Sequence, residues 1–307
     1  MFRTKAEANM WIAETEKAIL QGKYGKQQPE SNHTFNDLMQ RYAKQVSPTK
    51  RGAEWEIKRI NMLSRYGISS IPLEQLNQTH FAEWRDLRLG EVTPATVLRE
   101  WNLISNALNI AVNEWKWLPE NPLKGVRKPK QPPARTRRIS QDEIDRLLYA
   151  LGYSYSEKPE TVTSRVGASM LFAIETAMRA GEIASLAWDN LDFEKRVAKL
   201  PMTKNGFPRE VPLSAEAIRI IEQVKSVTES VNTVFNLNTA QIDALFRKAK
   251  KRAMIDDLHY HDSRAEAITR LAKKVDILTL ARISGHRDMR QLQIYYRESV
   301  EDIAKRI

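Results

Sequence analysis

A basic, proline-rich stretch over residues 124–138 divides this chain of 307 residues into two parts. Its prolines keep the backbone extended, and its lysines and arginines leave it no apolar face to bury against a core. We therefore predict a linker here, with a folded domain on each side. The chain is long enough for two domains that each bury a core of their own.

The part before the linker carries the pattern of helices. Thr34 and Asp37 have the spacing of a capping box, and apolar residues then recur every three or four positions. The second predicted helix should turn Trp55 and Ile60 inward. The predicted helices begin at about residue 34 and continue over about 49–66, 78–89 and 96–117. Four helices within residues 32–123 indicate an independent all-α domain.

The part after the linker, residues 139–307, predicts a second domain that is mostly helical. Ser140 and Glu143 have capping-box spacing at its start. Two strand candidates flank Asn205-Gly206, a dipeptide that favours a hairpin turn. The strands are expected over 197–200 and 209–213, and the helices over about 162–179, 181–186, 214–226, 239–253, 263–274, 276–283 and 289–304. The predicted fold class is mainly α, with one small antiparallel β-sheet in the second domain.

The charge of the chain favours a polyanionic partner. Forty-nine Lys and Arg residues against thirty-eight Asp and Glu residues give a formal net charge of +11. Each phosphate that a cation neutralises releases condensed counterions, so such a surplus favours nucleic acid. A solubility charge without a specific partner is the plain alternative. A membrane surface is less favoured, because the cations are spread along the chain and do not gather on one amphipathic helix.

The absence of cysteine excludes disulfides, thiolate metal sites and thiol nucleophiles. The sequence contains no apolar run long enough to span a bilayer, and its first residues lack the apolar core of a signal peptide. We therefore expect an intracellular protein of the cytoplasm that does not bind membranes.

Two adjacent tyrosines near the C-terminus are candidate functional residues. Gly285-His286 is predicted to open a helix that contains both. At about 100° per residue, Tyr296 falls on the apolar stripe of this helix and Tyr295 about 100° away from it. The other residues of the stripe are Met289, Leu292, Val300 and Ile303. Tyrosines at such positions are usually core residues, but this geometry buries Tyr296 and leaves the Tyr295 hydroxyl available as a nucleophile.

Cleavage of a phosphodiester by a tyrosine has three requirements. A phenol of pKa about 10 must lose its proton, a pentacoordinate phosphate must be stabilised, and a 5′ alkoxide must be protonated. Guanidinium groups suit the second task, because their planar forks bind non-bridging oxygens and stay charged. In isolation, each candidate arginine would be interpreted as a surface residue at a helix end.

Five short motifs of the second domain occur in an order that resembles the tyrosine recombinase (phage integrase) family. The motifs are Glu175–Ile183, Thr203–Gly206, His261–Arg264, Gly285-His286 and Tyr295. The resemblance covers about 34–307. It implies that the helical domain is a core-binding (SAM-like) domain and that residues 139–307 form the catalytic domain.

The resemblance also implies a role for each motif residue. Arg179 and Arg264 would bind the phosphate, and Tyr295 would be the nucleophile. His261 would bind the phosphate and handle the phenol proton, and His286 would hydrogen-bond the scissile phosphate. Lys204, beside the predicted turn, would be the general acid for the 5′ oxygen. Glu182 is predicted to be a structural partner of Arg179, and His259 a surface or packing residue.

Three features depart from the family pattern. Ala265 stands where the family often has histidine, and Ala177 where it often has glycine, so support for the catalytic residues could be weaker. Residues 2–20 predict a helix similar to the one that ends the arm-binding domain of phage-type members, but strands are missing before it. We therefore expect residues 1–31 to be an N-terminal helix and connection that represent a shortened or incomplete arm-binding domain.

By resemblance, the chain is expected to be a site-specific DNA recombinase of the integrase type. It would act as a tetramer on specific double-stranded sites, through a 3′-phosphotyrosyl intermediate and a Holliday junction, with DNA-bending accessory proteins as candidate partners. No metal or ATP is expected, because the sequence has neither an acidic or histidine cluster at ligand spacing nor a Walker-type loop. The alternatives are an invertase or resolvase of the same family, a type IB topoisomerase and a non-catalytic DNA-binding protein.

Two further interactions are predicted. The linker cations should follow a DNA backbone, with simple tethering as the alternative. These cations are Arg127, Lys128, Lys130, Arg135, Arg137 and Arg138. The last residues of the chain either dock on a neighbouring subunit or pack on their own domain.

Overall fold

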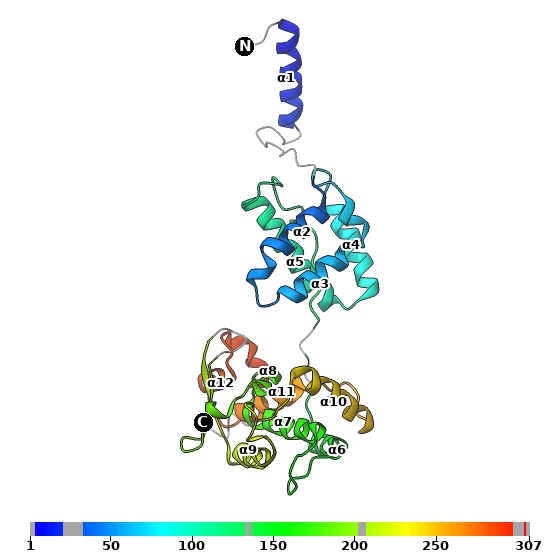
Figure 1. Ribbon diagram of the computed structural model, residues 1–307. Helices are drawn as coiled ribbons and strands as arrows, with labels where there is room; N and C mark the ends of the chain where they lie inside the picture. The colour runs from blue at the N-terminus through cyan, green and yellow to red at the C-terminus, as the bar shows by residue number, and fades with distance from the viewer. Residues whose placement is uncertain are drawn as a thin grey trace. The chain divides into compact units, whose positions relative to one another are not determined.

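The computed structural model describes residues 4–20, 33–132, 135, 137–201, 207–296 and 304 (Figure 1). The chain forms two compact units, residues 1–134 and 135–307, which we call unit 1 and unit 2. The four-part division at residues 31, 123 and 138 stays a prediction. No helix of the described residues is long and apolar enough to cross a membrane.

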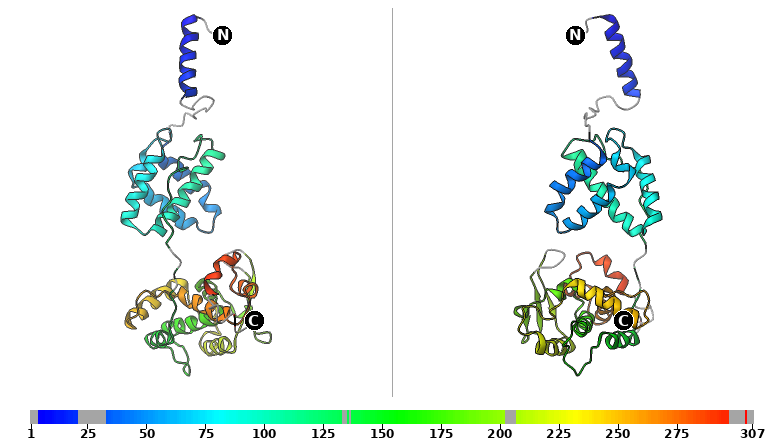
Figure 2. Two further views of the ribbon diagram at one scale, coloured as in Figure 1. Left: turned by 180° about the vertical axis from the view of Figure 1, so that it is seen from behind. Right: turned by 45° about the vertical axis from the view of Figure 1, so that its right-hand side comes forward.

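Unit 1 contains the predicted helical bundle. Helix α2 contacts α3 and α5, and α5 also contacts α4 (Figures 1 and 2). Its elements are α1 (Lys5–Leu20), α2 (Phe35–Gln45), η1 (Ser47–Thr49), α3 (Ala53–Leu63), η2 (Gly67–Ser70), α4 (Gln78–Glu91) and α5 (Pro94–Asn113). The Thr34 hydroxyl accepts from the Asp37 amide, and the Asp37 carboxylate accepts from the Thr34 amide at 2.8 Å. This capping box starts α2 where the sequence predicts it.

The prediction for Trp55 is wrong. A 3₁₀ turn and a tight turn occupy residues 47–52, so α3 begins at Ala53 and Trp55 lies in its first turn. The side chain of Trp55 is 39% exposed, and Arg59 lies over its ring. Ile60, one turn further along, is buried in the core as predicted.

Unit 2 is built around one buried helix, α7, which contacts α6, α9, α10 and α11 (Figure 1). Its helices are α6 (Gln141–Leu151), α7 (Val162–Thr176), α8 (Ala180–Ala184), η3 (Trp188–Asn190), α9 (Ala215–Thr228), α10 (Thr239–Arg252), α11 (His261–Ala272), α12 (Ile277–Ser284), η4 (Met289–Gln291) and η5 (Gln293–Tyr295). Gly167 of α7 packs closely on the chain that leaves α6, because a Cβ there would lie 2.6 Å from the Cβ of Tyr153.

The sheet of unit 2 has three antiparallel strands in the order β1-β2-β3. The strands are β1 (Leu191–Asp192), β2 (Val197–Leu200) and β3 (Arg209–Pro212). Val197 pairs with Pro212, and Leu200 with Arg209, so both predicted strands are present. Strand β1 was not predicted, because two residues are too few for a periodic pattern. The predicted turn at Asn205-Gly206 lies outside the described residues.

The prediction that Gly285-His286 opens a helix is wrong. Gly285 ends α12 with a positive φ of 71°, a conformation that glycine adopts without strain. The predicted helix over 289–304 is absent up to Tyr296, where the chain forms the short 3₁₀ turns η4 and η5. Asp288 caps η4 by accepting from the Arg290 amide, and Met289, expected in the core, is 43% exposed. Val300 and Ile303 lie outside the described residues.

Candidate active site

The predicted site residues of unit 2 lie at or near the ends of helices. Arg179 precedes α8, His261 is the first residue of α11, and His286 follows the end of α12. Arg264 lies in the first turns of α11 and is only 3% exposed. The charges of Arg264, Arg179 and His261 all act on His286, so these four residues are brought together.

Glu182 connects two arginines at this site. Its carboxylate accepts from the Arg179 side chain at 2.9 Å and from the Arg179 amide at 2.8 Å. It also accepts two bonds from the Arg209 guanidinium, at 2.7 and 2.8 Å. Although burial alone would raise the pKa of Glu182, the bonds from Arg209 and Arg179 hold this pKa at about 2. Glu182 therefore stays ionised and orients Arg179, as the sequence predicts.

Sequence analysis missed Arg209. The Nε of Arg209 donates to the Ile283 carbonyl at 3.0 Å, so this side chain joins β3 to the end of α12 as well as to Glu182. A Cβ on Gly285 would lie 3.2 Å from the Arg209 side chain, a tighter contact than usual, so this approach favours glycine. The sequence contained a sign of this role, because Arg209 lies two and four positions before the buried residues Val211 and Leu213 and so shares their face of the strand. An arginine on the apolar face of a strand indicates a buried partner.

Arg264 is a buried cation bound to uncharged groups. Its guanidinium donates to the carbonyls of Ser284, at 2.6 Å, and Ala177. Burial and the charge of Arg179 lower the pKa of Arg264 to about 9. The group remains charged at neutral pH at an energetic cost, which a bound anion would offset.

Position 177, where the family often has glycine, adopts a backbone conformation that favours glycine. Ala177 ends α7 with a φ of 54°, the left-handed region that favours glycine, and its carbonyl holds Arg264. An alanine costs about 1 kcal/mol in this conformation. Ala177 is buried in a small apolar cluster, which we call the small cluster. Its other buried members are Ala267, Ile268, Ala272, Leu280 and Leu292. The backbone that holds Arg264 therefore keeps the left-handed turn despite the missing glycine.

The hydrogen bonds of His286 define its tautomer. The Ser284 hydroxyl donates its only proton to the Leu280 carbonyl at 2.6 Å. The 2.8 Å contact between Ser284 Oγ and His286 Nδ1 must then be donated by Nδ1–H. In the neutral ring, Nε2 therefore carries a lone pair. Burial, followed by the charge of Arg264, lowers the pKa of His286 to about 4, so the ring is neutral until an anion binds.

His286 should titrate near pH 4 in the free protein, and inorganic phosphate should raise this pKa by at least about one unit. The pKa rises because an anion among the arginines cancels the positive potential that disfavours the imidazolium form of His286. Ring-proton NMR of His286 with and without phosphate measures the shift. His80 of unit 1 is the control, and its resonance should not respond to phosphate. A His286 titration that phosphate does not change would contradict an anion site here.

Tyr295 and Tyr296 have different surroundings. The Tyr296 hydroxyl donates to the Val275 carbonyl at 3.0 Å. Both tyrosine rings are half-buried against the small cluster, so the predicted contrast in burial between them is absent. Tyr295 is half-buried, and its hydroxyl makes no hydrogen bond within the described part of the chain. Burial raises the pKa of Tyr295, an effect that the charge of Arg264 partly offsets. The phenol is therefore protonated at neutral pH and needs a base to become a nucleophile.

A pocket of about 210 Å³ lies beside Tyr295. Ala265 and Thr269 of α11 line it together with both tyrosines. Ala265, where the family often has histidine, therefore lines the same pocket as the phenol of Tyr295. Among the described residues, no group of three or more His, Asp or Glu side chains could hold a metal ion.

Lys204 lies outside the described residues, so its predicted role stays a prediction. The first described residue after it is Phe207, and the Arg287 guanidinium lies 3.6 Å from the centre of the Phe207 ring. This contact joins the start of the segment leading into β3 to the residue after His286. His259, predicted to be a packing or surface residue, donates its amide to Asp262 at 2.8 Å.

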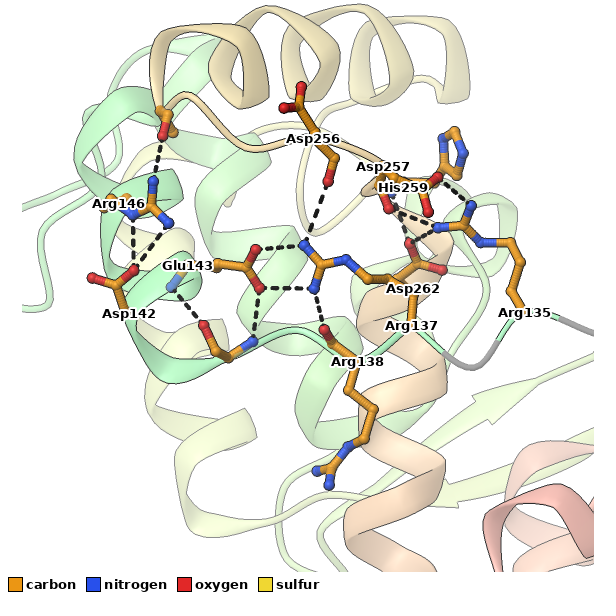
Figure 3. Close-up of polar contacts among 12 residues, drawn as sticks. Arg135, Arg137, Arg138, Asp142, Glu143, Arg146, Asp256, Asp257, His259 and Asp262 are labelled. Atoms are coloured by element: carbon orange, nitrogen blue, oxygen red, sulfur yellow. Dashed lines mark hydrogen bonds and ion pairs between the residues drawn. The ribbon is translucent and has the colours of Figure 1, made fainter.

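The predicted DNA-binding cations of the linker fall into two groups. Arg127, Lys128 and Lys130 are exposed and form no ion pair within the part of the chain that is described. The other three are bound to carboxylates of unit 2, and Figure 3 shows the pairs that Arg135 and Arg137 form. These pairs are Arg135 with Asp257 and Asp262, Arg137 with Glu143, and Arg138 with Glu266. The predicted DNA contacts of this second group would have to compete with these ion pairs.

Replacing Glu182 by Gln should lower the free energy of unfolding by roughly 3 kcal/mol at neutral pH, because its pKa falls from about 4.5 to about 2 on folding. This stabilisation is complete above the unfolded-state pKa and is lost as the pH falls through the folded-state pKa. Urea unfolding between pH 7 and pH 2 should therefore show that the free energy of unfolding of the variant lies below that of wild type by an amount that decreases below about pH 5.

Glu175→Gln is the control for this measurement. Glu175 accepts from Ser214 and forms no ion pair among the described residues. Its substitution should change the free energy of unfolding by about 1 kcal/mol or less. A Glu182→Gln gap that is small, or that does not depend on pH, would contradict the role of Glu182 as the anion between two arginines.

The chain is similar to known proteins in sequence and in fold. Residues 137–302 match the model of the phage integrase family. A putative integrase/recombinase of Haemophilus influenzae is 48% identical over 96% of this chain and 80% of its own length. The shufflon-specific DNA recombinase of Escherichia coli is 36% identical over 85% of this chain and 68% of its own length. A lambda integrase tetramer bound to a Holliday junction has the same fold, with a TM-score of 0.69 and 17% identity over 94% of this chain and 89% of that one.

Proposed function

Because this chain belongs to the phage integrase family of tyrosine recombinases, we propose that it cuts and rejoins DNA through Tyr295. It is a site-specific DNA recombinase, and double-stranded DNA is its substrate. The expected intermediate is a 3′-phosphotyrosyl linkage with a free 5′ hydroxyl. This bond keeps the cleaved linkage in a transferable form, so rejoining needs no ATP.

One observation carries the residue assignment most strongly. Arg264 is buried, and its hydrogen bonds go to two carbonyls and to no carboxylate among the described residues. A buried cation whose hydrogen bonds reach only neutral groups is costly, and an incoming phosphate would bring the anion that it lacks. Arg179 differs, because Glu182 already orients it, and its remaining donors can approach the same phosphate.

The other residues then take complementary tasks. We assign to His261 the acceptance of the phenol proton of Tyr295. Phosphate binding would raise the pKa of His286, so that Nε2–H can donate to a non-bridging oxygen while Nδ1–H stays on Ser284. We assign to Lys204 the protonation of the leaving 5′ oxygen. The two arginines stabilise the charge of the pentacoordinate phosphate between these proton transfers.

We further propose that four copies assemble on two recombination sites and exchange strands through a Holliday junction, with DNA-bending accessory proteins. The solved lambda integrase tetramer on a Holliday junction supports this assembly. We propose integration as the biological outcome and the bacterial cytoplasm, where the chromosome lies, as the place of action. Inversion is the second candidate, because the shufflon-specific recombinase is among the relatives of this chain.

Covalent capture tests the proposed function. The full chain is incubated in EDTA with nicked fragments of DNA from its source, and DNA linked to protein is isolated and sequenced. Adducts that cluster at one site are expected from a site-specific recombinase. Adducts scattered over all fragments would indicate a topoisomerase. Tight binding without adducts would indicate a non-catalytic DNA-binding protein.

A further inference from the structure

Helix α11 carries its charged residues on two opposite faces. Arg264 points into the candidate active site, and Asp262 and Glu266 lie two positions before and after it, about 200° round the helix. Both carboxylates are buried. They are four residues apart and so share one face of α11. The face of α11 opposite Arg264 therefore carries two buried anions, and both need cationic partners.

The chain entering unit 2 supplies these partners. Arg138 binds Glu266 with two parallel bonds, Nε to Oε2 at 3.0 Å and Nη2 to Oε1 at 2.9 Å. Arg135 donates to Asp262 at 3.0 Å and also pairs with Asp257 (Figure 3). Although burial alone would raise the pKa of Glu266, the bonds from Arg138 and Arg270 keep it low and the carboxylate ionised. The Arg138–Glu266 contact is specific, since a bidentate pair fixes direction as well as distance.

The same arginines stand beside the nucleophile. Arg135 and Arg138 line the 210 Å³ pocket together with Tyr295. The incoming chain, α11 and Tyr295 thus form adjoining walls of one pocket. A shift of the incoming chain would change the support of α11 and the pocket beside the phenol at the same time.

We propose that Arg135 and Arg138 are positioning residues that fix α11, with His261 and Arg264, to the incoming chain. The phosphate contacts of the basic segment then belong to Arg127, Lys128 and Lys130. If Arg138 left for a DNA phosphate, the buried Glu266 would keep, among the described residues, the single bond from Arg270 Nε in place of three bonds. This cost opposes a DNA-contact role for Arg138, whereas the exposed Lys128 incurs no such cost. The inference rests on the proposed function, in which α11 carries His261 and Arg264.

The test compares full-length Arg138→Gln, Glu266→Gln and their double variant with Lys128→Gln, a matched cation of the same segment. Binding to a labelled duplex of about 30 base pairs and arbitrary sequence is measured over a range of KCl. The salt slope is the slope of the logarithm of the binding constant against the logarithm of the KCl concentration. Lys128→Gln should lower the size of this slope by about 1, and Arg138→Gln should leave it unchanged. Hydrogen exchange without DNA should be faster in α11 for Arg138→Gln, and no faster in the double variant than in Glu266→Gln.

Single-turnover adduct formation on the captured nicked site gives the catalytic readout. At saturating protein, Arg138→Gln should lower the rate constant about tenfold, because a small displacement of catalytic groups costs one to two orders of magnitude. The fraction of protein that reacts should stay the same, whereas a merely destabilised fold would lower that fraction. The double variant should react no more slowly than Glu266→Gln.

A reduced salt slope in Arg138→Gln together with unchanged exchange in α11 would overturn the inference, because it would make Arg138 a phosphate contact. Additive effects of Arg138→Gln and Glu266→Gln on the rate constant would also overturn it. A wild-type protein that forms no adduct would refute the proposed function instead. The exchange experiment contains no DNA, so the two failures can be distinguished.

Discussion

Tyr295→Phe should abolish covalent adducts with DNA, a loss of at least about 10⁴-fold in the cleavage rate, because it removes the attacking oxygen. The ring of Tyr295 packs against the small cluster that contains Leu292, and phenylalanine keeps this packing. The free energy of unfolding and the affinity for DNA should therefore stay close to the wild-type values. Denaturing gels of protein incubated with a nicked duplex measure the adduct, and gel shifts measure the affinity.

Tyr296→Phe is the matched control one residue away. It removes the hydrogen bond to the Val275 carbonyl, which should lower the free energy of unfolding by about 1 kcal/mol. Adducts should still form. The opposite pattern, with adducts lost in Tyr296→Phe and kept in Tyr295→Phe, would assign the nucleophile to the neighbouring residue.

Arg264→Lys should lower the cleavage rate at saturating DNA by about 10³-fold, the upper end of what the loss of one transition-state donor costs. Lysine keeps the positive charge, but one ammonium group cannot hold the carbonyls of Ala177 and Ser284 and also present a fork to phosphate. The loss should therefore appear in the rate constant, measured by single-turnover adduct formation.

Arg165→Lys is the control for this substitution. Arg165 is another buried arginine of unit 2, and it donates to a backbone carbonyl, that of Glu160, at 2.7 Å. Its replacement should lower stability without lowering the rate constant of the folded protein. Equal rate losses in both variants would mean that Arg264 acts only through folding.

Most of the fold followed from local sequence signals. The capping boxes at Thr34 and Ser140 start α2 and α6, since each satisfies backbone donors that a helix leaves unpaired. Periodic apolar residues placed the helices of both units. The signal failed after Gly285, where the apolar spacing suited a helix but the chain turns. Leu292 is still buried in an apolar cluster, and both tyrosines pack against it; Tyr295 does so because a 3₁₀ turn places residues three apart on the same side.

The candidate site was predictable only in part. The family motifs supplied Arg179, Arg264 and His286, which the fold brings together. Arg209 belongs to none of these motifs, and its contacts to Glu182 and Ile283 depend on tertiary packing. The cations of residues 124–138 could not be assigned from the sequence. Charge density alone cannot separate cations that face solvent from those, such as Arg138, that meet a buried carboxylate from a distant helix.

The most direct test of the account is the identity of the residue that carries DNA. Adducts formed on the captured nicked duplex are digested with nuclease and protease, and the modified peptide is sequenced by mass spectrometry. The account predicts a nucleotide joined through its 3′ phosphate to the Tyr295 oxygen. A nucleotide on Tyr296 or any other residue, or a linkage through a 5′ phosphate, would contradict it.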